Sequence, residues 1–370
     1  MKIGFDAKRA FHNTTGLGNY SRDLIRILSE YYPENQYVLY NPKQPRVERL
    51  HLTNQIQMKM PSGYWSKKWP SLWRSHWVVN DAVKDKIDIF HGLSGELPVG
   101  INKTNIKTLV TIHDLIFLRF PELYRFIDRK IYTAKFKSAA KNADKIVAIS
   151  EATKQDIIQF FDINPKKIDV IYQGCHHIFK QSFTHNDQLN VIKKYNLPNE
   201  FLLNVGTIEP RKNAFNIVKA IKDSNYQLVL VGRKTKYAKQ IEAYIHKHNM
   251  QNRVYFLEGL SLKELAILYQ QAKIFLYPSL YEGFGIPIIE ALYSKTPVIT
   301  NKYGVFKEAA GPYSYYVENV KDPAQIKEKI DKAWQNKNTE LVNKSYEFVQ
   351  KFNDNVIAKN WMDLYQKLQH

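Results

Sequence analysis

The sequence predicts an α/β protein built from two doubly wound parallel sheets that face each other across a cleft. Three observations lead to this prediction. The chain has 370 residues, about the length of two ordinary domains. Short apolar runs alternate with amphipathic stretches, which is typical of strands that alternate with helices. The alternation is interrupted once, by a polar stretch at residues 180–200, and then resumes.

The strand candidates are short runs rich in β-branched and aromatic residues. Most are continuously apolar, as expected for parallel strands that are buried on both faces. They are residues 1–7, 36–41, 87–92, 108–114, 145–150 and 169–174 before the polar stretch, and 201–207, 226–232, 253–259, 274–279 and 297–301 after it. The helix candidates between them include residues 20–32, 150–161, 213–223 and 261–272.

The polar stretch is the natural linker. The sequence therefore predicts a Rossmann-like domain over residues 1–185, a second one over 186–350, and a terminal helix within 351–370. Ligands of such sheets bind beyond the carboxyl ends of the strands. Motifs that directly follow strands are therefore the candidate functional sites.

The composition is strongly basic. Lysine and arginine number 54 against 35 aspartate and glutamate residues, for a formal charge of +19. Such a surface attracts nucleic acid, anionic lipid or phosphorylated substrates. The chain has no zinc-finger spacing, RNA-recognition aromatic signature or basic-zipper heptad, so nucleic acid is not an expected partner.

Cysteine usage and hydropathy bear on the compartment. The single Cys175 cannot form an internal disulfide, which indicates a reducing compartment. It lies beside His176 and His177, and we favour a buried structural thiol over a nucleophile or a metal site. No run approaches the ~20 apolar residues of a membrane span, and the N-terminus lacks the apolar core of a signal peptide. We therefore expect a cytoplasmic protein.

The segment VGTIEPRKN (205–213) follows a predicted strand. Gly206 permits a tight turn, and Arg211 and Lys212 would open the next helix. Cations at a helix N-terminus oppose the helix dipole, and a bound anion would relieve that conflict. Arginine can also bind two oxygens at once. The pattern favours a diphosphate site over a solvated helix start.

The segment YPSLYEGFGIPIIEAL (277–292) follows another predicted strand. Gly283 and Gly285 leave the backbone open to a ligand, and Pro287 suits a first helical position. Glu290 falls within an apolar stretch and needs a partner if it is buried. The two vicinal hydroxyls of a ribose would supply hydrogen-bond donors. A helix cap or a salt bridge is the alternative.

Two weaker motifs lie in the first half. TGLGNYSRDL (15–24) places Gly16 and Gly18 ahead of a helix, but it departs from the dinucleotide-binding fingerprint at Ser21. TIHDLIF (111–117) places His113 and Asp114 at the carboxyl end of a strand. A histidine there can hydrogen-bond a sugar hydroxyl or steady a leaving phosphate. A purely structural His–Asp pair fits equally well.

Taken in order, these motifs resemble the retaining glycosyltransferases of family 4, which have the GT-B fold, and in particular bacterial mannosyltransferase-like members. The segments that carry the resemblance are TGLGNY, TIHDLIFLRFPE, VAISEATKQDI, VGTIEPRKN and YPSLYEGFGIPIIEAL, and they cover nearly the whole chain. The resemblance implies an acceptor-binding first domain, a nucleotide-sugar-binding second domain and a last helix that crosses back to the first domain.

The resemblance also implies roles in the second domain. Arg211 and Lys212 would hold the donor diphosphate, Glu290 the ribose, and Glu282 the donor sugar. The other donor-binding positions that it implies are Gly206, Gly283, Phe284 and Gly285. In the first domain, His113 would lie near the reacting sugar.

Further positions in the first domain are implied in less detail. Gly16 and Gly18 would line the donor phosphates or the acceptor. Ser150 and Glu151 match a family position beside the cleft.

The implied reaction is a hexosyl transfer that retains the anomeric configuration, by front-face attack assisted by the leaving phosphate. The sequence has no two aspartates separated by one residue, the clamp of many metal-dependent sugar transferases. We expect neither a metal nor a cofactor, and a GDP- or UDP-linked donor with mannose favoured. Glu282 as a covalent nucleophile is a lesser possibility. A nucleotide-sugar epimerase of the same fold, or a non-catalytic protein that binds polyanions or a membrane surface, are the alternatives.

Four tryptophans fall within residues 63–79 at a spacing of four, interleaved with cations. Tryptophan beside basic residues suits a membrane interface. The residues expected at an anionic membrane surface are Trp65, Lys67, Lys68, Trp69 and Trp73. Alternatively, Trp73 and Trp77 pack into the core and Pro70 interrupts the helix. The expected acceptor is a glycan or a lipid-linked molecule in surface polysaccharide assembly, and membrane contact would indicate the lipid-linked one.

Overall fold

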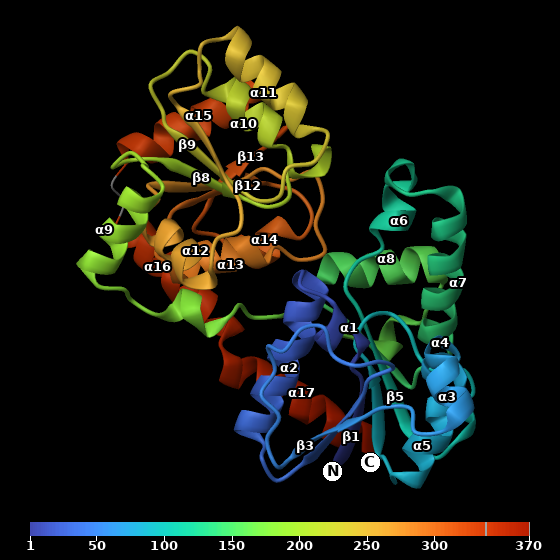
Figure 1. Cartoon of the computed structure of the whole chain (residues 1–370). Coiled ribbons are helices and arrows are strands. Elements are labelled where there is room, and N and C mark those ends of the chain that lie inside the picture. Colours follow the sequence, from blue (N-terminus) through green and yellow to red (C-terminus); the bar gives the residue numbers. More distant parts are fainter. Residues whose placement is uncertain (337–338, 370) are drawn as a thin grey trace. The chain divides into compact units, whose positions relative to one another are not determined.

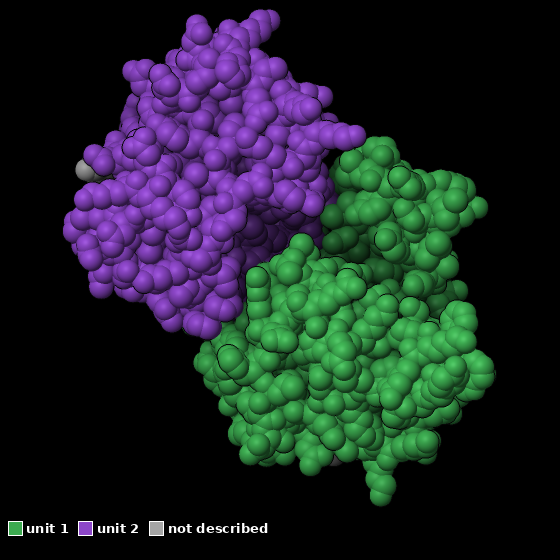
Figure 2. Space-filling view, in the orientation of Figure 1, with its two compact units in different colours: residues 1–173, 353–370 green, residues 174–352 purple. Residues whose placement is uncertain are grey.

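The computed structural model describes residues 1–336 and 339–369, and the chain divides into two compact units. Unit 1 comprises Met1–Gln173 together with Asn353–His370, and unit 2 comprises Gly174–Phe352. Figure 1 traces the elements along the chain, and Figure 2 colours the two units. Each unit is an α/β domain around its own sheet, as the sequence predicts.

Unit 1 contains a seven-stranded sheet with the order β3-β2-β1-β4-β5-β6-β7, in which every neighbouring pair is parallel. The strand order reverses between β1 and β4, which pair through Ile3 and Ile89. The strands are β1 Lys2–Asp6, β2 Gln36–Tyr40, β3 Ile56–Lys59, β4 Ile89–Gly92, β5 Lys107–Ile112, β6 Lys145–Ala148 and β7 Ile168–Val170.

Helices connect these strands. The α-helices of unit 1 are α1 Lys8–His12, α2 Gly16–Tyr31, α3 Tyr64–Lys68, α4 Pro70–Leu72, α5 Val78–Lys84, α6 Ile116–Arg119, α7 Phe126–Asn142, α8 Glu151–Phe161 and α17 Asp354–Gln369. Shorter turns are the π-helix η1 Trp73–Trp77 and the 3-10 helices η2 Ile101–Lys103, η3 Pro121–Leu123 and η4 Pro165–Lys167.

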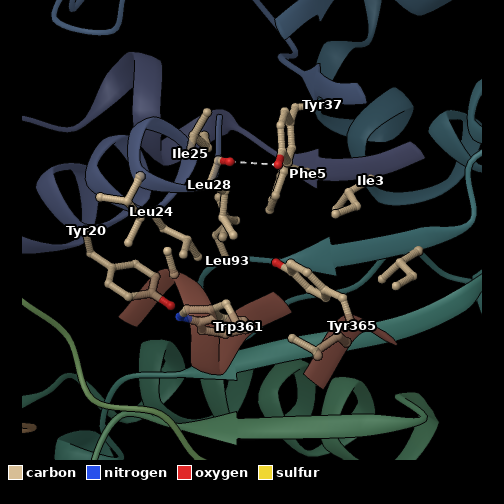
Figure 3. Close-up of a cluster of buried hydrophobic side chains, with 14 of the residues drawn as sticks. Ile3, Phe5, Tyr20, Leu24, Ile25, Leu28, Tyr37, Leu93, Trp361 and Tyr365 are labelled. Atoms are coloured by element: carbon tan, nitrogen blue, oxygen red, sulfur yellow. Dashed lines mark hydrogen bonds between the residues drawn. The ribbon is translucent and has the colours of Figure 1, made fainter. Parts of the chain in front are cut away.

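The largest core of unit 1 joins segments from both ends of the chain. The apolar face of α2, with Leu24 and Leu28, packs together with β1 and with Trp361 and Tyr365 of α17 (Figure 3). The hydroxyl of Tyr37 donates a hydrogen bond to the Leu28 carbonyl at 2.8 Å. Burial of these large side chains fixes α17 in unit 1, although it is the last element of the sequence.

Unit 2 contains a six-stranded, all-parallel sheet with the order β10-β9-β8-β11-β12-β13, which reverses between β8 and β11. The strands are β8 Leu202–Val205, β9 Leu228–Val231, β10 Val254–Leu257, β11 Ile274–Tyr277, β12 Val298–Asn301 and β13 Tyr315–Val317. The helices are η5 His177–Lys180, α9 His185–Lys194, η6 Pro210–Lys212, α10 Ala214–Ala220, α11 Ala238–Lys247, α12 Leu262–Gln271, α13 Ile286–Tyr293, α14 Phe306–Ala310, α15 Pro323–Gln335, α16 Thr339–Val349 and η7 Gln350–Phe352.

The domain boundaries differ from the predicted ones. Unit 1 ends its first segment at Gln173 rather than at residue 185, and residues 180–200 are not a linker. They contain α9, which packs on α12 through an ion pair of 2.6 Å between Lys194 and Glu264. The linker prediction was wrong because the polar composition of this stretch is that of an amphipathic helix on the protein surface. At the other end, unit 2 extends to Phe352 rather than residue 350.

Two strands escaped the sequence analysis. Both β3 and β13 lie at an edge of their sheet, and each buries only one of its residues fully. Such strands lack the continuous apolar run on which the prediction relied. Within the described residues, no helix has the length and apolar character that crossing a membrane requires.

Candidate active site

The two strongest motifs follow the two strands that flank the reversal of strand order in unit 2. The first follows β8 and the second follows β11, and these strands are paired neighbours. The Leu280 amide donates to the Arg211 carbonyl at 2.9 Å, and the Asn213 side chain donates to the Pro278 carbonyl at 3.0 Å. The two loops are thus tied together at the position where parallel sheets bind ligands.

A partly buried ion cluster joins the loops. Nη1 of Arg211 lies 2.8 Å from Oε1 of Glu282, and Nζ of Lys212 lies 2.7 Å from the same oxygen. Nη2 of Arg211 pairs with Glu209 at 2.7 Å, and Nζ of Lys212 donates to the hydroxyl of Tyr277 at 2.7 Å. Two cations therefore face two carboxylates, and the cluster is electrically balanced.

Charge within the cluster controls its ionisation. Burial opposes ionisation of Glu282, yet the charges of Lys212 and Arg211 hold the pKa of its carboxyl group below the ordinary value. Burial likewise acts to lower the pKa of Arg211, but Glu282 and Glu209 raise it. Both partners are therefore charged at neutral pH, and the arrangement can exchange one bound oxyanion for another.

One detail of the predicted diphosphate site is wrong. Arg211 and Lys212 do not open an α-helix, because they lie in the 3-10 turn η6, and α10 begins only at Ala214. Asn213 intervenes with a left-handed conformation, φ 63°. The positive ends of these side chains are thus balanced by Glu282 and Glu209 and not opposed by a helix dipole.

Glycines shape the same edge of the sheet. Gly206 has φ +150°, and a Cβ atom there would lie 3.4 Å from the aliphatic chain of Lys212. Gly232, after β9, has φ +146°, and its Cβ atom would lie 2.0 Å from the Gly206 carbonyl oxygen. The turn after β8 can therefore form only where β9 also ends in glycine.

The loop after β11 contains Gly283, Phe284 and Gly285, which the resemblance implies as donor-binding positions. The side chain of Phe284 is buried, with its ring 5.5 Å from that of Phe352, so only its backbone could meet a donor. Gly283 lies partly buried in the loop. Gly285, with φ +122°, is the N-cap of α13, and Pro287 occupies the second helical position rather than the first.

Glu290 lies on α13, one helix beyond the ion cluster. Its Oε2 accepts a hydrogen bond of 2.9 Å from the hydroxyl of buried Tyr269 on α12. Burial raises the pKa of Glu290 to about 7. A carboxylate has about four lone-pair positions, so Tyr269 leaves the group the capacity to accept from a diol as well.

In unit 1, His113 directly follows β5 and is buried. Its Nε2 lies 2.9 Å from the Leu93 carbonyl, which can only accept, so Nε2 carries the proton. Burial lowers the pKa of His113 to about 4. The ring is therefore neutral at pH 7 and presents Nδ1 as an acceptor. It suits a sugar hydroxyl and not the leaving phosphate that the sequence analysis also allowed.

Helix α2 and strand β4 support this histidine. The ring of Tyr20 on α2 meets His113 edge-on, with centroids 4.5 Å apart. The Tyr20 hydroxyl lies 3.4 Å from Oγ1 of Thr111, which lies 2.8 Å from Nε2 of His91. His91 in turn contacts the hydroxyl of Tyr365 on α17 at 2.8 Å. A buried and uncharged chain of contacts thus reaches His113.

The structure places the remaining candidate residues of unit 1 at the starts of helices α2 and α8. Gly18 lies in the first turn of α2, where a Cβ atom would be 1.9 Å from the Asn13 carbonyl oxygen, whereas one at Gly16 would meet no atom within 4 Å. Ser150 is the N-cap of α8 and accepts from the Thr153 amide at 3.0 Å. Glu151 is the exposed first residue of that helix.

Asp114, Cys175 and His176 occupy positions in local backbone structure. The carboxylate of Asp114 accepts from the Ile116 amide at 3.2 Å, at the start of α6. Cys175 is buried, and Nδ1 of His176 accepts from the Ile178 amide at 3.3 Å. The predicted preference for a buried structural thiol agrees with these positions.

The tryptophan segment divides in two. Trp73 is wrong as a membrane residue: it is 1% exposed, packs in a core cluster, and donates through Nε1 to Asp81 at 2.6 Å. Trp77 packs against the same cluster. Trp65 and Trp69 are 62% and 55% exposed. The helix breaks at Pro70, which begins α4, so the spacing of four does not keep the tryptophans on one face.

Several site residues escaped the sequence analysis. Glu209 stands two positions before Arg211, and its charge beside two cations was a usable signal. Tyr277 and Tyr269 lie in apolar runs where an aromatic residue predicts only packing. Asn213 could have been recognised as a turn residue, because asparagine tolerates the left-handed backbone conformation. Tyr20 occupies an apolar position of a helix, and nothing in the sequence distinguishes it from a residue that only packs in the core.

Family comparisons match both halves of the chain. The family described as Glycosyltransferase Family 4 matches residues 14–177, and that described as Glycosyl transferases group 1 matches residues 187–351. The chain is 32% identical over 210 residues to the O-antigen chain mannosyltransferase RfbU of Salmonella typhimurium (strain LT2), a match that spans 56% of either protein.

Two further proteins are similar over most of their length. The O-antigen chain mannosyltransferase B of Escherichia coli is 25% identical over 334 residues, with 84% of this chain and 85% of that protein covered. The crystal structure of Anabaena Alr3699/HepE in complex with UDP and glucose superposes with a TM-score of 0.74 at 17% identity, with coverage of 99% and 100%. The chain therefore belongs to glycosyltransferase family 4 and has the GT-B fold of two Rossmann-like units.

Proposed function

We propose that this protein is a metal-independent, retaining hexosyltransferase that moves mannose from a GDP- or UDP-linked donor to a glycan or lipid-linked acceptor in surface polysaccharide assembly. The observation that carries the proposal is the ion cluster of Arg211, Lys212 and Glu282 beside the reversal of strand order in unit 2. The family match supports the reaction class, and the names of two relatives support mannose.

The donor diphosphate binds Arg211 and Lys212. Its oxygens take the place that Oε1 of Glu282 holds between the two cations. Glu282, displaced from the two cations, then accepts hydrogen bonds from the hydroxyls of the donor sugar. The nucleoside ribose hydroxyls donate to Glu290, which lies on the helix that follows the same loop.

In the transfer step, the bond between C1 of the sugar and the donor phosphate oxygen breaks, and the electron pair stays on that oxygen. An acceptor hydroxyl oxygen bonds to C1 from the same face, and its proton passes to the departing phosphate oxygen. Arg211 and Lys212 stabilise the negative charge that develops there. His113, neutral and with Nδ1 as acceptor, binds a hydroxyl of the reacting sugar.

A thermal-shift panel tests the donor side of the proposal. GDP, UDP, dTDP and ADP are each added with magnesium or with EDTA. A ligand at ~100 times its dissociation constant stabilises the folded protein by about 2.7 kcal/mol. We expect one guanine or uracil nucleotide to raise Tm equally in magnesium and in EDTA. A rise that EDTA abolishes would contradict metal independence, and no rise with any nucleotide would contradict the donor site.

A further inference from the structure

Unit 1 has its own reversal of strand order, between β1 and β4. Ligands of parallel sheets bind beyond the carboxyl ends of the strands at such a position. Asp6 is the last residue of β1, and Glu96 stands four residues after the end of β4. Arg74 of η1 pairs with both carboxylates. An ion cluster therefore occupies the same topological position in unit 1 that Arg211 and its two carboxylates occupy in unit 2.

Asp6 fixes the orientation of Arg74. Nε of Arg74 donates to Oδ1 and Oδ2 of Asp6 at 2.9 Å and 3.0 Å, and Nη2 also donates to Oδ2. Asp6 is only 6% exposed, and its Oδ1 accepts from the Lys8 amide at 3.3 Å. A bidentate pair of this kind defines the plane of the guanidinium group. Asp6 therefore holds Arg74 in place and is not a group that a ligand can displace.

Glu96 lies beside the same guanidinium group and retains hydrogen-bonding capacity. Its Oε2 accepts from Nη1 of Arg74 at 2.9 Å and contacts Nζ of Lys135 at 3.5 Å. Its Oε1 accepts no hydrogen bond from residues 1–336 or 339–369. Arginine has five N–H groups, and Arg74 uses three of them here, so two remain. The side chains of Arg74 and Glu96 are 13% and 23% exposed, so a ligand can reach these free groups.

The turn that carries Glu96 also reaches His113. The Leu93 carbonyl at its start accepts from Nε2 of His113 at 2.9 Å. A Cβ atom on Gly92 would lie 2.1 Å from the Glu96 carbonyl oxygen, so glycine is needed for the turn to fold back on the strand. The Ser94 hydroxyl within the turn is enclosed and has no hydrogen-bond partner in the described part of the chain. Buried hydroxyls nearly always have a partner, so the turn retains a polar group that a ligand can satisfy.

The charge of the cluster favours a neutral ligand. Its two carboxylates balance Arg74 and Lys135. An anion that approached Arg74 would meet both carboxylates, whereas Glu282 in unit 2 lies between two cations and can yield to an anion. A sugar hydroxyl both donates and accepts, so a vicinal pair can accept from Arg74 and donate to Oε1 of Glu96. Exposed Lys8, whose charge interacts with the cluster, is a further donor for a hydroxyl oxygen.

We propose that Arg74 and Glu96, with Asp6 as a positioning residue, form a subsite for two vicinal hydroxyl groups of a neutral sugar. The subsite is argued from unit 1 alone. That the sugar is the acceptor rests on the proposed function.

Saturation-transfer NMR titrations of the full chain test the subsite. The probes are the methyl glycosides of mannose, glucose, galactose and N-acetylglucosamine, with and without a saturating nucleoside diphosphate that keeps the cations of unit 2 occupied. We expect at least one glycoside to bind the parent. Glu96→Gln should bind it about fivefold more weakly or worse, because a hydrogen bond to a charged group is stronger than one to a neutral group. The matched control is Glu30→Gln, which breaks an ion pair with Arg26 in the same unit and should bind like the parent.

Glycosides that lack one ring hydroxyl separate direct contact from a structural role. Removal of a hydroxyl that meets Glu96 should weaken binding by the parent, but much less so by Glu96→Gln, because that variant has already lost the contact. Parent-like binding by Glu96→Gln, losses that simply add, or failure of all four glycosides to bind the parent would overturn the subsite. Tighter binding of mannose 6-phosphate than of the methyl mannoside, lost in Arg74→Gln, would overturn the preference for a neutral sugar.

Nucleotide binding keeps this test separate from the proposed function. Glu96→Gln should retain the nucleotide-induced rise in Tm. Glycoside binding that depends on Glu96 in a parent without such a rise would sustain the subsite and refute the proposed function. A rise in Tm without glycoside binding would refute the subsite and leave the donor site standing.

Discussion

The two units carry candidate residues of opposite electrostatic kind. In unit 2, the side chains of Arg211, Lys212 and Glu282 are charged and held by one another. In unit 1, His113 is neutral, and the chain of contacts that supports it consists of uncharged groups. Under the proposed function, we expect a corresponding division of roles, in which unit 2 exchanges oxyanions and unit 1, at His113, orients hydroxyl groups without placing charge beside them.

The largest effect should follow from Arg211→Ala. This change removes a cation that pairs with both Glu282 and Glu209, and with it one of the two cations proposed to stabilise the leaving diphosphate. Loss of one such group costs ~10²–10³ in turnover. We expect that loss in a transfer assay with the preferred donor. The control is Lys234→Ala, which breaks a surface ion pair with Glu242 in the same unit. Turnover near the parent's in Arg211→Ala would remove the ionic half of the comparison.

Two glycines of α2 separate folding from function in unit 1. In Gly18→Ala the new methyl group meets the Asn13 carbonyl, so we expect a loss of about 1–3 kcal/mol of stability. In Gly16→Ala it meets no atom, and stability should change by no more than about 1 kcal/mol. Tm values measure both. If Gly16 lines a ligand, Gly16→Ala folds normally but transfers sugar more slowly. Parent-like transfer would show that no ligand approaches Gly16.

The pKa of Glu290 predicts a pH effect on nucleotide binding. Only the ionised carboxylate accepts from both ribose hydroxyls, and with a pKa of about 7 the ionised fraction rises about tenfold between pH 6 and pH 8. We therefore expect the parent's affinity for its nucleoside diphosphate to rise by that factor. Glu290→Gln should lack this component, and the pH dependence that remains belongs to the phosphate. Identical pH profiles for the two proteins would contradict the ribose assignment.

The same shift has a consequence for stability. The folded protein holds the Glu290 proton more tightly than the unfolded chain, where the ordinary pKa is ~4.3. This contribution to the free energy of unfolding is complete below pH ~4.3 and is lost as the pH rises to about 7. Glu290→Gln removes that loss, so the variant should gain stability relative to the parent as the pH rises through this range.

The smallest effect concerns Glu282→Gln. The amide no longer competes as an anion for Arg211 and Lys212, so the nucleoside diphosphate should bind about fivefold more tightly, or ~1 kcal/mol, which is the scale of one partly exposed charge pair. Turnover of the sugar donor should fall, because the sugar loses its carboxylate. Isothermal titration and a transfer assay measure the two quantities. Weaker diphosphate binding in the variant would show that Glu282 supports the cations and does not compete with the ligand.

The alternation of apolar runs with amphipathic stretches determined both sheets and most of their strands, because a parallel strand that is buried on both faces leaves an uninterrupted apolar signal. It also determined where the candidate site residues lie, since the motifs after β8 and β11 must emerge at one edge of one sheet. The edge strands β3 and β13 and the helix α9 left no such signal, because they are only partly buried.

The partners of the candidate residues depended on the tertiary structure. The sequence shows that Arg211 and Lys212 are adjacent, but Glu282 reaches them from a loop 70 residues later, across paired strands. In the same way, a spacing of four suggested one face for four tryptophans, whereas packing around Pro70 buried Trp73 and left Trp65 exposed. Local pattern records propensity and burial; which charges meet, and which aromatic groups face water, is settled only when distant segments pack together.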